Sequence, residues 1–171
     1  MKHILILRHA KSSWDEAGLS DFDRPLAKRG IEDAPMMGKF VKKTGLIPDL
    51  VYSSPALRAN QTTELFCKAA TVQNEKIYWN DRFYYGSPAD YIKAVHNIDS
   101  NDKDIILLVG HNPLVESTVS LLCSNGENNL IRMPTAALVC LECQVSAWKN
   151  TGKNTARLKW MMTPRLLKKI Q

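Results

Sequence analysis

The stretch that decides the fold of this chain is Lys2-His3-Ile4-Leu5-Ile6-Leu7-Arg8-His9-Ala10-Lys11-Ser12-Ser13. Its four consecutive aliphatic residues predict a strand that is buried on both faces. The chain then turns abruptly into an arginine, a histidine, a lysine and two hydroxyl side chains. Open α/β sheets bind their ligands at the carboxyl ends of the strands. Cationic and nucleophilic groups at this position therefore favour an anion-binding site.

Length and charge bound the class of protein. The 171 residues fit one ordinary domain that buries its own core, and neither a repeat nor a composition shift marks a boundary, so we expect a single domain over residues 1–171. The 23 Lys and Arg against 17 Asp and Glu give a formal charge of +6, which fits an anionic substrate, nucleic acid or solubility alone. Because no nucleic-acid motif accompanies the charge, we expect no nucleic-acid partner.

The four cysteines do not form the framework of a small secreted protein. Cys140 and Cys143 have the spacing of half a zinc site, but they fall in a predicted strand, where positions three apart point to opposite faces. No second pair has a matching spacing, so we expect buried thiols, no metal and no cofactor. The apolar run at the N-terminus is too short for a signal peptide or a membrane span, which predicts a cytoplasmic protein without a membrane partner.

Strands and helices alternate along the rest of the chain. After a surface loop over Trp14–Arg24, helices are expected over Lys28–Lys43, after Ser53, after Ser87, after His111 and, as a short basic helix, at the C-terminus. Further strands are expected at Leu50–Tyr52, Ile77–Trp79, Ile105–Val109, Ala136–Leu141 and Arg157–Met161. The run at 105–109 has no polar interruption, which is typical of a central strand. The alternation predicts an α/β fold: a three-layer α/β/α sandwich around a mostly parallel sheet.

Two helices carry more detailed expectations. The periodicity of the first predicts a buried face made of Ile31, Ala34, Met37 and Val41. The segment Ser53-Ser54-Pro55 predicts a helix with a hydroxyl cap and proline at its first position. Arg58 then lies in the opening turns of that helix, just past the end of a strand.

Four cationic or titratable side chains share one place in this topology. His9 and His111 each follow a strand, and the helix after another strand carries Arg58 near its start. In a parallel sheet these strand ends lie at the same edge, so both histidines can converge with Arg8 and Arg58. The helix that starts at Asn112 would add free amide donors and a positive dipole end.

Such a cluster of donors suits a phosphoryl group. Guanidinium forks match phosphate oxygens, and phosphoryl transfer is catalysed mainly by positioning and by neutralising charge on the equatorial oxygens. No Asp or Glu pair at metal-site spacing stands beside an aspartyl or glycine-rich phosphate motif. The arginines would then replace magnesium, which favours a metal-free mechanism with a covalent intermediate on His9.

Three ordered blocks resemble the signatures of the histidine phosphatase superfamily: Arg8-His9, Ser53-Ser54-Pro55-x-x-Arg58-Ala59-x-Gln61-Thr62, and Gly110-His111-Asn112-Pro113. Longer strings are similar to its small SixA-like branch, the phosphohistidine phosphatases: Leu7-Arg8-His9-Ala10-Lys11-Ser12, Asp23-Arg24-Pro25-Leu26, Tyr85-Gly86-Ser87-Pro88 and Pro134-Thr135-Ala136-Ala137. The resemblance covers nearly the whole chain. It implies a phosphoglycerate mutase-like fold.

The resemblance also implies roles for particular residues. His9 would attack phosphorus and become transiently phosphorylated, while Arg8, Arg58 and His111 would hold the transferring oxygens. For attack His9 needs a neutral ring, whereas His111 would serve best as a cationic donor, so we expect their environments to push the two titrations apart. The further substrate-binding residues that we expect are Ser12, Asn112 and Thr135.

The general acid is the weakest part of the pattern. Larger members of the superfamily place a glutamate just before a Tyr-Gly turn, and here Asp81 stands nearby, with Asp15 as a second candidate. An alkoxide leaving group needs a proton at departure, whereas phosphohistidine has a labile P–N bond and a better leaving group. A weak or missing acid therefore favours phosphohistidine.

The sequence thus predicts a metal-independent phosphatase that removes phosphate from phosphohistidine in a protein through an intermediate on His9. Two alternatives stay open. One is a small-molecule phosphomonoesterase that uses the same nucleophile with Asp81 or Asp15 as the acid, and the other is a non-catalytic phosphate-binding module. The sequence names neither the substrate protein nor the oligomeric state.

Overall fold

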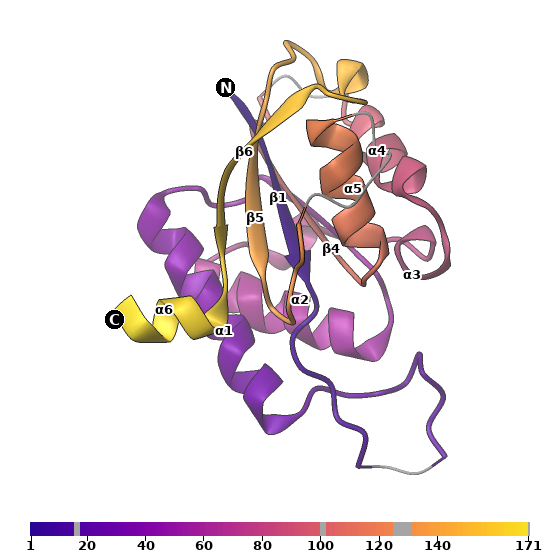
Figure 1. Ribbon diagram of the computed structural model, residues 1–171, viewed down its shortest axis with the longest axis vertical. Helices are drawn as coiled ribbons and strands as arrows, with labels where there is room; N and C mark the ends of the chain where they lie inside the picture. The colour runs from indigo at the N-terminus through magenta and orange to yellow at the C-terminus, as the bar shows by residue number, and fades with distance from the viewer. Residues whose placement is uncertain (16–17, 100–101, 125–130, 171) are drawn as a thin grey trace.

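The structure, a computed structural model, describes residues 1–15, 18–99, 102–124 and 131–170. Within these ranges the strands are β1 (Lys2–Arg8), β2 (Leu50–Ser53), β3 (Ile77–Trp79), β4 (Ile105–Gly110), β5 (Leu138–Cys143) and β6 (Ala156–Met162). They form a sheet in the order β3-β2-β4-β1-β5-β6. Figure 1 labels its strands β4, β1, β5 and β6. The strands β3, β2, β4 and β1 run parallel, while β5 is antiparallel to β1 and β6 is antiparallel to β5. The predicted mostly parallel sheet is confirmed.

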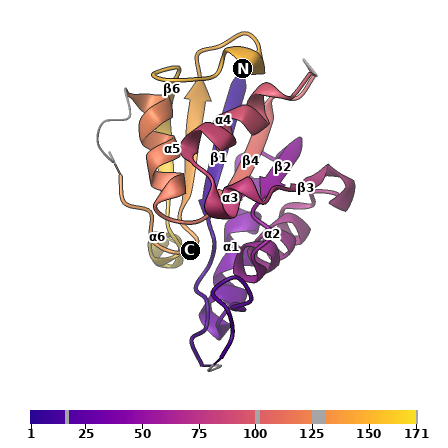
Figure 2. The ribbon, with the colours of Figure 1, turned by 90° about the vertical axis from the view of Figure 1, so that its right-hand side faces the viewer.

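Helices cover both faces of the sheet. One core cluster involves α1 (Lys28–Thr44), α2 (Leu57–Ala70) and α6 (Pro164–Ile170), and the other involves α3 (Arg82–Tyr85), α4 (Pro88–His96) and α5 (Leu114–Cys123). Figure 2 shows α3, α4 and α5 grouped together, apart from α1 and α2. Successive residues of β1 alternate between the two clusters, since Ile4 and Ile6 belong to one and Leu5 and Leu7 to the other. This is the predicted three-layer α/β/α sandwich.

The buried face of α1 differs from the prediction at one position. Ala34, Met37 and Val41 are buried as expected, but the side chain of Ile31 is 52% exposed. The buried stripe begins instead at Gly30, which lies so close to Lys11 that an added Cβ atom would stand 2.3 Å from its carbonyl oxygen. At this position of α1, the backbone of Gly30 therefore packs against the backbone of Lys11 after β1, and no apolar side chain is buried.

The start of α2 is also different. The helix begins at Leu57 rather than at Pro55, and the residue before it, Ala56, provides no side-chain cap. The hydroxyls that were expected to cap it are engaged elsewhere: Ser53 shares a hydrogen bond of 2.8 Å with Thr63, and the Oγ atom of Ser54 lies 2.8 Å from a ring nitrogen of a histidine. At α4, by contrast, the residues Ser87 and Asp90 form a capping box, and Pro88 occupies the first position of the helix.

The cysteines behave as apolar side chains of the strands. Cys140 and Cys143 are buried on opposite faces of β5, as expected, and neither forms a disulfide. Within the described residues no cluster of three His, Cys, Asp or Glu side chains could hold a metal ion. None of the described helices is both long and apolar enough to cross a membrane.

Candidate active site

The register between β1 and β4 places two histidines side by side. Arg8 pairs with Gly110 at the carboxyl ends of these parallel strands, so that the next residue of each strand, His9 or His111, enters the same edge of the sheet. The backbone N–H of His9 donates to the carbonyl of Gly110 at 2.9 Å. The two imidazole centroids are 5.0 Å apart, and both residues are buried. The predicted convergence of the two histidines is confirmed.

Gly110 lets the end of β4 lie directly against a buried tyrosine. The hydroxyl of Tyr91 donates to the carbonyl of Phe83 at 3.0 Å, and the two rings stack with centroids 3.8 Å apart. A Cβ atom on Gly110 would stand 1.9 Å from that hydroxyl oxygen. The absence of a side chain at Gly110 thus fixes where His111 leaves the strand.

One nitrogen of His9 is free to act as a nucleophile. Its Nδ1 atom lies 2.8 Å from the carbonyl oxygen of Ala10, and a carbonyl can only accept, so Nδ1 carries the proton and Nε2 keeps its lone pair. The N–H of Ala10 donates in turn to Thr62 Oγ1 at 3.0 Å, which holds the turn in place. Burial, followed by the nearby positive charge of Arg58, lowers the pKa of His9 to about 4. The ring is therefore neutral near pH 7.

His111 has one engaged nitrogen and one without a partner. Its Nε2 atom lies 2.8 Å from Ser54 Oγ, whereas its buried Nδ1 atom has no hydrogen-bond partner among the described residues. Burial, followed by the charges of His9 and Arg58, lowers the pKa of His111 to about 3. The expectation of a cationic His111, with the two titrations pushed apart, is wrong in this structure, because both rings are buried beside arginines.

Arg58 lies in the first turn of α2, as expected, and binds an acidic residue of the loop after β1. Its Nη2 atom donates to Asp21 Oδ2 at 2.8 Å, and its Nη1 atom donates to the backbone carbonyl of the same residue. Arg24 donates to Asp21 Oδ1 at 3.0 Å, and the Tyr84 hydroxyl donates to Oδ2 at 3.0 Å. Although burial opposes it, these hydrogen bonds lower the pKa of Asp21 to about 2.

Sequence reasoning did not select Asp21, Arg24 or Tyr84 as site residues. The available signals were the acidic character of a long loop and the Asp-Arg-Pro-Leu string, and neither identifies which carboxylate reaches an arginine. Tyr84 lies on the short helix α3, and its ring meets His111 edge to face with a centroid distance of 5.4 Å. Trp14 stacks on Arg24, whose guanidinium carbon lies 3.2 Å from the ring centroid. The loop and α3 thus supply a wall of the site that the motifs did not indicate.

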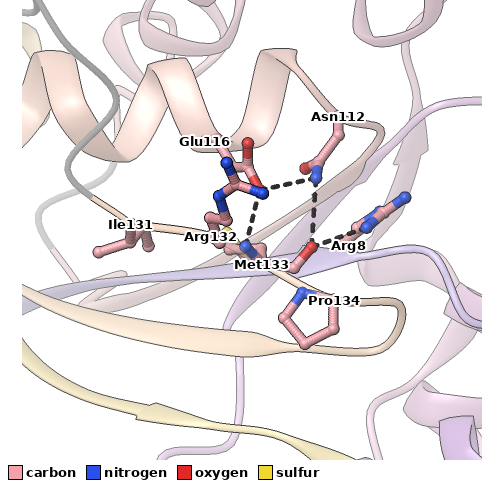
Figure 3. Close-up of a pocket in the computed structure, with 7 residues that line it drawn as sticks. All are labelled: Arg8, Asn112, Glu116, Ile131, Arg132, Met133 and Pro134. Atoms are coloured by element: carbon pink, nitrogen blue, oxygen red, sulfur yellow. Dashed lines mark hydrogen bonds between the residues drawn. The ribbon is translucent and has the colours of Figure 1, made fainter.

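Arg8 is hydrogen-bonded to the segment that precedes β5. Its Nη1 atom donates to the carbonyl of Met133 at 2.8 Å, and burial lowers the pKa of its guanidinium. The charges of Arg8 and Arg58 both act on the two histidine rings. Arg8 also lines a cavity of about 510 Å³ together with Asn112, Glu116, Ile131, Arg132, Met133 and Pro134 (Figure 3).

The remaining predicted residues lie around this cluster in different ways. The buried hydroxyl of Ser12 accepts a hydrogen bond from Arg24 Nη2 at 2.7 Å. The hydroxyl of Thr135, a half-buried residue, accepts one from Arg29 at 3.2 Å. Asp15 is exposed and accepts a hydrogen bond from the Ser13 hydroxyl at 2.7 Å. Asp81 is exposed just before α3. Among the described residues, neither carboxylate is hydrogen-bonded to His9 or His111.

The chain is similar to known proteins in sequence and in fold. The sequence profile of the histidine phosphatase superfamily (branch 1) matches residues 4–78. The chain is 29% identical to the phosphohistidine phosphatase SixA of Escherichia coli over 96% of each chain, and 28% identical to an uncharacterised chloroplastic protein of Arabidopsis thaliana over 95% of this chain and 78% of that one. A solved structure of the protein histidine phosphatase SixA with tungstate superposes with a TM-score of 0.79 at 23% identity, covering 96% of this chain and 99% of that chain, which supports the same fold.

Proposed function

We propose that this chain, which resembles the histidine phosphatase superfamily over residues 4–78 and the phosphohistidine phosphatase SixA over nearly its whole length, is a metal-independent phosphatase of phosphohistidine in a protein. The observation that carries this proposal is the state of His9, a buried neutral imidazole that lies beside His111, keeps the lone pair of Nε2 and feels the positive charges of Arg58 and Arg8. A single domain over residues 1–171 and a cytoplasmic location stay predictions, as do the absence of nucleic-acid and membrane partners.

The proposed reaction has two displacements at phosphorus. His9 Nε2 attacks, a new P–N bond forms, and the bond from phosphorus to the substrate nitrogen breaks, with its electron pair leaving on the substrate imidazole. Water then attacks the phosphorylated His9, which releases inorganic phosphate and restores the free imidazole. Arg8 and Arg58 neutralise the equatorial oxygens in both steps.

His111 would act as the third donor. An anionic phosphoryl group beside the ring favours its protonated form, in which both ring nitrogens are hydrogen-bond donors. Substrate binding would in this way raise a pKa that burial lowers to about 3. Ser12, Asn112 and Thr135 stay proposed substrate-binding residues, and Ser12 would act indirectly, through its hydrogen bond to Arg24.

The candidates for a general acid support phosphohistidine over an alkyl ester. Asp21, the carboxylate bonded to Arg58, has a pKa of about 2 and is ionised near pH 7, so it has no proton to give. Asp81 and Asp15 are exposed and remain candidates only for the small-molecule alternative. A P–N bond needs less assistance at departure than the C–O–P bond of an alkyl ester.

A substrate panel tests the specificity. We expect turnover of a phosphohistidine peptide to exceed that of an aryl phosphate, and both to exceed that of an alkyl phosphate. Fastest turnover of the alkyl ester would instead support the phosphomonoesterase alternative. In that case Asp81→Asn or Asp15→Asn should lower the rate with the alkyl ester far more than the rate with the phosphohistidine peptide.

Trapping the intermediate tests the mechanism and the non-catalytic alternative. Wild-type protein quenched during turnover should carry an acid-labile phosphoryl group, which should be absent from His9→Ala. Protein that binds phosphate but never forms this intermediate would be a binding module. The matched control is His96→Ala, because His96 lies on α4 and bonds to the carbonyl of Thr151, away from the cluster.

A further inference from the structure

The carboxylate of Glu116 lies outside the cluster of Arg8, His9, Arg58 and His111. It binds the backbone segment to which Arg8 is hydrogen-bonded. Glu116 lies in the first turn of α5, and its Oε1 atom accepts from the backbone N–H of Met133 and from Asn112 Nδ2, each at 2.7 Å. The carbonyl of Met133 accepts from Arg8 Nη1 at 2.8 Å and from Asn112 Nδ2 at 3.2 Å. Figure 3 shows this chain of hydrogen bonds running from Glu116 to Arg8 along one wall of the cavity.

We propose that Glu116 is a positioning residue that fixes the guanidinium of Arg8 through the backbone of Met133 and the side-chain amide of Asn112. The inference rests on the proposed function of Arg8 as a ligand of the transferring phosphoryl group. No direct hydrogen bond joins Glu116 to Arg8 among the described residues. The charge of Glu116 favours the cationic form of Arg8, and its hydrogen bonds hold the acceptor of that arginine.

The surroundings of Arg8 make such support necessary. The Nε atom of Arg8 is buried and has no hydrogen-bond partner among the described residues, so its Nη1 bond to Met133 is the contact that sets the orientation of the guanidinium. Met133 is 1% exposed, and both polar atoms of its backbone are used, the N–H by Glu116 and the carbonyl by Arg8. Loss of the Glu116 acceptor would leave a buried N–H unpaired and release this backbone.

A purely structural role of Glu116 makes different predictions. An acidic side chain in the first turn of a helix stabilises the helix through its dipole, whichever groups lie nearby. That role would lower the melting temperature of a variant and leave phosphate binding by the folded protein unchanged. A positioning role changes phosphate binding and kcat in protein that is still folded.

The first test compares two substitutions of Glu116 in the full chain. Glu116→Ala removes the acceptor, and we expect kcat with the phosphohistidine peptide to fall by about 10–100-fold and the Kd of inorganic phosphate, measured by calorimetry, to rise. Glu116→Gln keeps an oxygen at the same place without the charge, so it should restore most of both losses. The matched control is Glu64→Ala, an exposed glutamate in the helical interior of α2, which should change neither quantity. Equal losses in Glu116→Gln and Glu116→Ala would overturn the proposal.

A double-mutant cycle separates positioning from general damage. Glu116→Ala should weaken phosphate binding in the wild-type background and have little further effect in an Arg8→Ala background, because its effect passes through that arginine. Equal effects in both backgrounds, or a lowered melting temperature alone, would overturn the proposal. Binding of inorganic phosphate needs no turnover. Failure of the wild-type protein to hydrolyse any substrate would thus count against the proposed function, while the cycle would still decide the role of Glu116.

Discussion

The carboxylate of Asp21 lies 2.8 Å from Nη2 of Arg58 and ties the loop after β1 to the first turn of α2. The arginine side chain is 7% exposed, whereas the aspartate is 54% exposed, so a surface residue neutralises a buried cation of the site. A phosphoryl group that binds Arg58 must share it with this carboxylate.

Removing the charge of Asp21 should strengthen phosphate binding. Asp21→Asn keeps an oxygen that can accept from Arg58 but no longer repels a phosphate dianion, so we expect the Kd of inorganic phosphate to fall by about 2–5-fold, the range of a partly exposed charge pair. The difference should shrink at high salt. Asp23→Asn removes the same charge from the same loop, where its carboxylate bonds to Ser20, and serves as the control. Weaker phosphate binding in Asp21→Asn than in Asp23→Asn would contradict this account.

For catalysis, the paired N–H donors of the Arg58 guanidinium should matter more than its positive charge. Arg58→Lys keeps a cation but cannot present two parallel N–H donors, so we expect kcat/KM with the phosphohistidine peptide to fall by about 100-fold. The same exchange at Arg157, an exposed residue of β6, should leave kcat/KM unchanged. Full activity of Arg58→Lys would show that charge alone suffices.

The pKa values of His9 and His111 should lie far below that of free imidazole. Burial lowers the pKa of His9 to about 4 and that of His111 to about 3, against an ordinary value of 6.5, so the NMR signals of both rings should stay those of neutral imidazole down to pH 5. Saturating tungstate, an oxyanion like phosphate, should raise the pKa of His111. Titration of both rings near pH 6.5 in the free protein would refute this prediction.

Acidification should destabilise the folded protein through the imidazoles of His9 and His111. Their pKa values are lower in the folded state than the ordinary 6.5, so the unfolded chain binds protons first as the pH falls. The free energy of unfolding should therefore decrease from about pH 6.5 toward pH 4. Urea titrations of wild type and His9→Gln at several pH values measure this, and the variant should show a shallower loss over that window.

Gly110→Ala should be destabilising because of one close contact. The new Cβ atom would stand 1.9 Å from the Tyr91 hydroxyl oxygen, and we expect a loss of about 1–3 kcal/mol in the free energy of unfolding. Tyr91→Phe removes that oxygen at the cost of its hydrogen bond to Phe83. The double variant should lose less than the sum of the two single variants in urea titration, whereas simple additivity would exclude this contact as the cause.

Most of the architecture could be predicted because it follows from apolar runs and from turns. The uninterrupted strands at Ile4–Leu7 and Ile105–Val109 place His9 and His111 at one edge, and the structure has both there. Two local details could not be read from periodicity. Ile31 is exposed because the backbone after β1 lies against Gly30, and Pro55 precedes its helix because the neighbouring hydroxyls bond inside the protein.

The wall formed by Asp21, Arg24 and Tyr84 was beyond prediction for a different reason. These contacts join the loop after β1 to the helices α2 and α3. Their geometry depends on how three segments that are distant in sequence pack together in the folded protein. The protonation of His111 was also missed. Its motif resembles that of a cationic donor, but the balance of burial and neighbouring arginines exists only in the folded protein.

The pairing of Arg8 with Gly110 has a consequence for how the protein acquires activity. Side chains of a strand alternate between faces, so a slip of β1 by one residue against β4 would send every one of its side chains to the other face and would carry His9 away from His111. A molecule with the wrong strand register cannot retain a weakened version of this site. Recovery of phosphate binding after refolding should therefore rise in step with correct assembly of the central sheet, which makes binding itself a reporter of the native state.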